Sequence, residues 1–115
     1  LALQQFSDYL KFYPESELAG NAQFYVGDIH YRQNSFEQAV AEYDKVLERY
    51  PGGNKAAAAQ LKKGLALLEL GQRQAAIREF NSLVARHPQS PEAAQARERL
   101  RRLQTSARRS TRRSE

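Results

Sequence analysis

The chain has 115 residues, 41% of them hydrophobic, and a formal net charge of +5. That length predicts one domain with a modest core. Cysteine is absent, which excludes disulfides, thiolate zinc sites and a cysteine nucleophile. No apolar run reaches the length of about 18 residues that a membrane-spanning helix needs. Residues 1–96 carry ten Lys and Arg against eleven Asp and Glu, whereas residues 97–115 carry eight Arg against two Glu. The basicity therefore belongs to the C-terminal end and says little about what the body binds.

The most regular feature is a dipeptide ending in proline that recurs every 37 residues, at Tyr13-Pro14, Tyr50-Pro51 and His87-Pro88. A period of about 20–50 residues is typical of solenoids, in which each repeat packs on its neighbours. Residues 1–14 predict half a repeat, because Phe6 lies one period before Tyr43. The abrupt start, without Met, predicts a fragment of a longer protein.

Two full repeats follow, over residues 15–51 and 52–88, and each predicts a pair of helices. In the first repeat we expect helices over 22–33 and 36–49, with Ser35 and Gln38 forming a capping box. In the second repeat the apolar residues from 57 to 68 share one helix face, and Gly71 ends that helix as a C-terminal cap. The second helix runs from about Ala76 to the His87-Pro88 stop.

The C-terminal region predicts a capping helix over 91–103 and a basic, disordered tail over 104–115. Ser90 is the expected N-cap, with Pro91 in the first helical position. Arg101 stands where the repeats have Gly27 and Gly64, so we expect no further helix to pack closely there. The tail reads most simply as a solvated end. Contact with anionic lipid or cell-wall polymer is an alternative, and nucleic acid is disfavoured because 97–115 contain no aromatic residue.

These features predict an all-α fold and resemble the tetratricopeptide repeat (TPR), whose motif W-x2-L-G-x2-Y, A-x3-F, P spans about 34 residues. We therefore expect a TPR α-solenoid over 1–103, with about six helices in antiparallel pairs that form a right-handed superhelix. Gln23 and Gln60 replace the tryptophan of the motif, and the extra residues of each period follow its proline. The positions with a structural role in the repeat are Gly27, Gly64, Ala39, Ala76, Tyr43, Phe80, Pro51 and Pro88.

A narrower resemblance is carried by Tyr13 to Gly27, by Tyr31, by 36–39 and by 46–51. These segments are similar to the C-terminal TPR domain of the Tol-Pal system protein YbgF, also called CpoB. The resemblance implies a periplasmic adaptor, made with a signal peptide, that binds TolA and coordinates outer-membrane constriction with the peptidoglycan synthase machinery during cell division. It also implies that the full-length protein is a homotrimer through a coiled coil absent from this sequence. The outer-membrane assembly lipoprotein BamD has similar Tyr-Pro repeats and is the alternative.

In a TPR array the first helices of the pairs line a groove that binds peptides. The residues predicted to line it are Asn21, Phe24, Tyr25, Asp28, Tyr31, Arg32, Leu61, Lys62, Leu65 and Leu68. For each aromatic and leucine a role in the core is an equal alternative, and the charged residues could be plainly solvated. Asp28 stands where a clamp for C-terminal carboxylates needs asparagine, so such a ligand is not expected.

No residue pattern points to catalysis. The glycine fingerprints of nucleotide-binding and hydrolase sites are missing. His30 and His87 are the only histidines and lie far apart in the sequence, so we predict no metal site. We therefore expect a protein that is not an enzyme, has no cofactor, and binds protein rather than nucleic acid. The apolar face around Phe6 and Tyr9 could allow the fragment to self-associate.

Overall fold

The computed structural model describes residues 2–16 and 18–114, and the side chains of these residues up to 106. Within this part of the chain there are six helices and no strand, so the prediction of an all-α fold is confirmed. The helices are α1 (Ala2–Phe12), α2 (Ala19–Arg32), α3 (Phe36–Arg49), α4 (Ala56–Glu69), α5 (Arg73–Arg86) and α6 (Pro91–Ser114).

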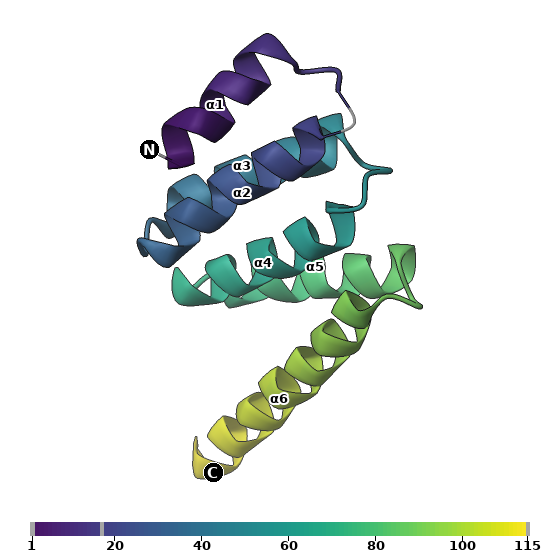
Figure 1. Cartoon of the computed structure of the whole chain (residues 1–115). Coiled ribbons are helices and arrows are strands. Elements are labelled where there is room, and N and C mark those ends of the chain that lie inside the picture. The colour runs from purple at the N-terminus through teal and green to yellow at the C-terminus, as the bar shows by residue number, and fades with distance from the viewer. Residues whose placement is uncertain (1, 17, 115) are drawn as a thin grey trace.

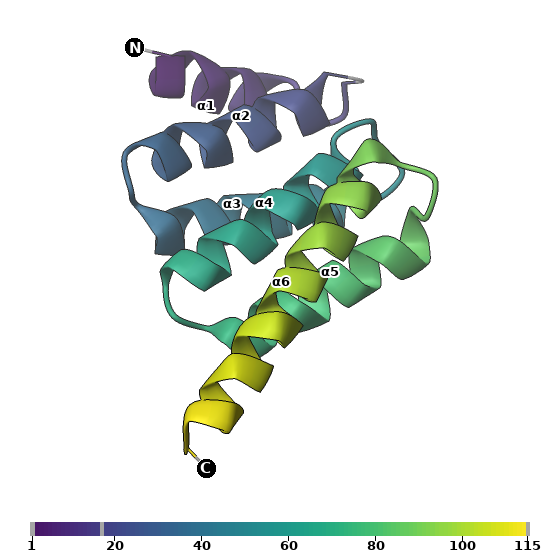
Figure 2. The same ribbon diagram turned by 90° about the horizontal axis from the view of Figure 1, so that it is seen from below.

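The helices stack in chain order into an elongated helical solenoid (Figure 1). Each helix packs against the next one, and α6 also packs against α4. The pairs α2/α3 and α4/α5 are the two predicted repeats, with α1 at one end of the stack and α6 crossing the other end (Figures 1 and 2). The resulting molecule measures 58 × 29 × 18 Å.

A glycine opposite a buried aromatic ring sets the spacing within each pair. A Cβ atom added to Gly27 would lie 2.6 Å from the ring of Tyr43, and one added to Gly64 would lie 2.9 Å from two ring carbons of Phe80. Both rings are fully buried, as are the small residues Ala39 and Ala76. The two helices of a pair can therefore approach closely only because the glycines lack side chains.

The helix ends agree only in part with the sequence. Gly71 has a φ of +78°, in the left-handed region that the predicted C-terminal cap requires. The Ser90 cap forms as well, because the Ala93 amide donates to Ser90 Oγ over 3.0 Å. The predicted capping box is wrong, since the side chain of Ser35 makes no cap hydrogen bond. The helix α2 begins at Ala19, before the expected start at 22.

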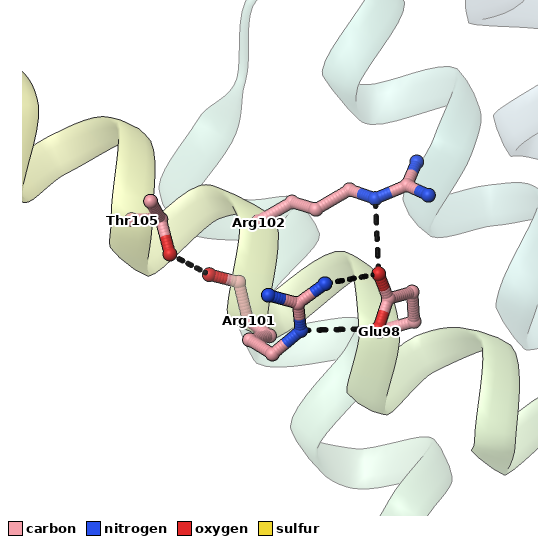
Figure 3. Close-up of polar contacts among 4 residues, drawn as sticks. All are labelled: Glu98, Arg101, Arg102 and Thr105. Atoms are coloured by element: carbon pink, nitrogen blue, oxygen red, sulfur yellow. Dashed lines mark hydrogen bonds and ion pairs between the residues drawn. The ribbon is translucent and has the colours of Figure 1, made fainter.

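The last helix continues past its predicted end at 103 and runs to Ser114, so the expectation of a disordered tail from 104 is corrected. Residues 104–114 contain neither Gly nor Pro, and Arg, Ala and Gln are good helix formers. Glu98 pairs with Arg101 and Arg102 one turn further on, and Thr105 Oγ1 donates to the Arg101 carbonyl (Figure 3). Polar residues sustain a helix here without a core-facing stripe.

Candidate protein-binding face

Two of the predicted groove residues belong to the core. Phe24 is 5% exposed and packs with Ala39 and Tyr43. Leu61 is also 5% exposed and packs with Phe80 in a second cluster. Their exposed area is too small for a partner to contact, so for these two residues the structure favours the core alternative over the groove.

The Asp28 carboxylate ties three helices together. It accepts a hydrogen bond from the Tyr43 hydroxyl of α3 over 2.6 Å, and Lys62 Nζ of α4 lies 3.6 Å from the same oxygen. Burial, followed by the hydrogen bond to the anionic Asp28, raises the pKa of the Tyr43 phenol far above its ordinary value. Asp28 is itself buried, so its main role is to hold α2 in place against α3 and α4.

Tyr31 lies where charges from three helices converge. Its ring meets Phe36 edge-on, with 5.3 Å between centroids, and Lys62 Nζ lies 5.2 Å from the ring centroid. Burial and the Glu69 carboxylate of α4 raise the pKa of Tyr31, while the Arg99 guanidinium of α6 opposes them. We call the surface formed by Tyr31, Lys62, Glu69 and Arg99, above the buried Asp28, the inner face. It spans α2, α4 and α6, the first helices of successive repeats.

The remaining groove predictions on α2 and α4 flank the inner face. Leu65 and Leu68 are half-buried and pack against the cluster around Phe80. Arg32 is exposed at the end of α2. The two leucines thus supply a partly accessible apolar border to a charged and aromatic surface.

Asn21 and Tyr25 lie apart from the inner face, in a pocket of about 370 Å³ between α1 and α2. Tyr25 stacks on Phe6 with 5.4 Å between ring centroids. The Asn21 Oδ1 atom is buried and accepts no hydrogen bond from any described residue. The predicted groove therefore divides into two places, and its apolar aromatic part faces α1.

Sequence reasoning missed two cations beside these aromatics. Lys55 Nζ lies 5.3 Å from the ring centroids of both Phe24 and Tyr25. Arg99 is exposed and is the α6 residue of the inner face. Arg99 follows Lys62 by one period, so aligning the repeats could have identified it as a groove residue. The sequence instead indicated a terminal cap of the solenoid for this helix.

The comparison with known families supports this architecture. The sequence model of the YfiO family, described as outer membrane lipoprotein, matches residues 1–109. The chain belongs to this family. No curated protein matches the chain. The match supports a TPR-type family, whose domains are typical of protein–protein interaction, but it does not single out YbgF. It associates the chain with the outer-membrane side of the cell envelope.

No helix within 2–16 and 18–114 is long and apolar enough to cross a membrane. In the same part of the chain no three His, Asp or Glu side chains are grouped so that they could hold a metal ion.

Proposed function

We propose that this YfiO-family domain is a protein-docking subunit of an outer-membrane protein assembly machine, as BamD is, and that it acts on the periplasmic side of that membrane. The observation that carries the proposal is the family match over residues 1–109. The match favours the BamD-like alternative of the sequence analysis over the Tol-Pal adaptor.

The inner face is the surface that we assign to the partner segment. Tyr31 and Lys62 supply an aromatic ring capped by a cation, a combination frequent at the energetic centres of interfaces. Arg99 and Glu69 add one charge of each sign within reach of the ring. A segment with apolar and charged side chains, extended or helical, can lie across α2, α4 and α6 and meet each of these groups.

Binding of purified partners to immobilised chain tests the proposal. The analytes are the other subunits of the assembly machine from the same organism. Arg99→Glu and Tyr31→Ala should each weaken binding about tenfold or more, as expected for residues at an energetic centre. Arg78→Glu is the matched control, because Arg78 is exposed on α5, outside the inner face. Thermal melting verifies that each variant is folded. No binding to any subunit, or equal loss with Arg78→Glu, would contradict the proposal.

The second candidate is the Tol-Pal adaptor, favoured by the run Asn21-Ala22-Gln23-Phe24 that carries the resemblance. On this hypothesis the domain binds TolA, and the complete protein trimerises through a coiled coil. A TolA fragment belongs in the same binding experiment as a separate analyte. Binding of TolA but of no assembly subunit, with the same sensitivity to Arg99→Glu, would replace the first candidate by the second.

A further inference from the structure

A groove of about 540 Å³ lies between α5 and α6, away from the inner face. Its apolar surface comes from Ile77, Leu100 and Leu103, and its cationic rim comes from Arg73, Arg97 and Arg101. No carboxylate is among the described residues that line it. Arg97 and Arg101 are four residues apart on one side of α6, whereas Arg99 lies between them on the other side.

The same groove exists one repeat earlier, where α5 fills it. The residues one period before Arg97, Leu100 and Arg101 are Gln60, Lys63 and Gly64 of α4. Gln60 donates to Glu79 of α5 over 3.1 Å, and Lys63 Nζ lies 2.7 Å from the other oxygen of that carboxylate. Gly64 faces the ring of Phe80. The filled groove therefore takes a helix that presents a glutamate followed by an aromatic residue.

The first repeat repeats this arrangement with other residues. Gln23 of α2 donates to Glu42 of α3, and Gly27 faces Tyr43, the next residue. Two independent pairs of helices thus share one contact pattern. A glutamine of the first helix donates a hydrogen bond to a glutamate of the second, and a glycine of the first helix leaves room for the aromatic ring that follows this glutamate.

In the α5/α6 groove arginine occupies both equivalent positions, Arg97 in place of Gln60 and Arg101 in place of Gly64. Arg97 uses one of its N–H groups on the Pro88 carbonyl, over 2.9 Å, and a guanidinium has further donors to offer. A carboxylate in the position of Glu79 would therefore meet a cation at 97 in place of the neutral amide of Gln60. This cation replaces the one that Glu79 finds in Lys63, because Leu100 stands at the equivalent of Lys63. Arg101 leaves no room for an aromatic ring in the position of Phe80. Even a Cβ atom at the equivalent Gly64 would meet the Phe80 ring within 2.9 Å.

We propose that the α5/α6 groove binds an amphipathic helix of a partner protein, with a carboxylate where α5 has Glu79 and a small residue where α5 has Phe80. Arg101 is paired with Glu98, so the positive charge offered to a ligand comes mainly from Arg73 and Arg97. With no carboxylate among the described lining residues, this charge makes an acidic helix the complementary occupant. The apolar surface of Ile77, Leu100 and Leu103 takes the apolar stripe of that helix. This site is separate from the inner face and does not depend on which envelope partner binds there.

The test uses a labelled peptide derived from the chain's own α5. The acidic peptide has residues 73–86 with Phe80→Ala and with each of its three arginines changed to Glu. It should bind the chain and shift the methyl signals of Ile77, Leu100 and Leu103. Arg97→Gln should weaken binding about tenfold, because it replaces an ion pair with the carboxylate by a hydrogen bond from an uncharged amide. Arg78→Gln, which removes the same charge from α5 at an exposed position outside both the groove and the inner face, should leave the affinity unchanged.

The steric half of the proposal has its own test. An acidic peptide that retains Phe80 should bind the chain at least about tenfold more weakly than the Phe80→Ala peptide, and Arg101→Gly should restore its affinity. Failure of Arg101→Gly to admit the Phe80 peptide would overturn the assignment, and so would equal loss in Arg97→Gln and Arg78→Gln. A dimer that Arg97→Gln abolishes in sedimentation experiments would assign the groove to a second copy of the chain and refute a separate partner.

Discussion

Replacing Gly64 by alanine tests the close packing on which both repeats depend. The new Cβ atom would lie 2.9 Å from two ring carbons of Phe80, well inside van der Waals contact. Phe80 is fully buried, so its ring has no free space to enter. Alanine gains about 1 kcal/mol over glycine from helix propensity, whereas overpacking costs about 1–3 kcal/mol. The net range is therefore about 0–2 kcal/mol, and because the ring has no free space we expect the free energy of unfolding to fall by about 1 kcal/mol or more.

Urea denaturation followed by circular dichroism measures this change. Gly52→Ala is the control, because a Cβ atom at Gly52 has nothing within 4 Å, and we expect a change within about 0.5 kcal/mol. The double variant Gly64→Ala with Phe80→Leu, which shortens the opposing side chain, should lose at least about 1 kcal/mol less than the sum of the two single variants. A Gly64→Ala chain as stable as its parent would refute the steric reasoning, and with it the role that we assign to Arg101.

Three further outcomes follow from the buried polar groups and the helix caps. Folding raises the pKa of Tyr43 above its ordinary 10.0 and that of Lys63 above its ordinary 10.5. The stability that each protonated group contributes is therefore complete at neutral pH and is lost as the pH rises above its ordinary pKa. Denaturation measured at increasing alkaline pH should detect this loss. Tyr43→Phe should lower stability by about 1–3 kcal/mol at pH 7, by leaving Asp28 without its donor, and should flatten the alkaline decline in the same titration. Ser90→Ala should cost about 1 kcal/mol in a thermal melt, because the Ala93 amide loses its acceptor.

The repeat period predicted most of the fold because it is a local and additive signal. Aligning the repeats was sufficient to mark Gly27, Tyr43, Gly64 and Phe80 as structural positions. That Gly27 faces Tyr43 and Gly64 faces Phe80 comes from the structure. The end of α6 escaped this reasoning, since no apolar periodicity marks residues 104–114. Helix propensity, in a stretch without Gly or Pro, favours the continuation of the helix instead.

The candidate site was harder to predict than the fold. The first helix of a repeat contacts neighbours on several sides, so spacing alone does not separate a residue that faces another helix from one that faces solvent. Phe24 and Tyr31 are both aromatic residues of α2, yet Phe24 is buried between helices while Tyr31 stays partly accessible beside Lys62. The distinction depends on cross-helix contacts, which the sequence does not contain.

The arginines of α6 show how one helix can serve two surfaces. Ala93 and Ala96 are fully buried, as are the alanines one period earlier, so the side of α6 that joins the stack is unchanged. The altered positions are Arg97 and Arg101. Their equivalents in α4 are Gln60, which donates to Glu79, and Gly64, which faces the ring of Phe80. Arg99, two residues from each of them, instead acts on Tyr31 of the inner face, whose pKa its charge lowers. Charge changes at 97 and 99 should therefore act on different partners, and a single partner sensitive to both would require the two surfaces to be continuous around α6.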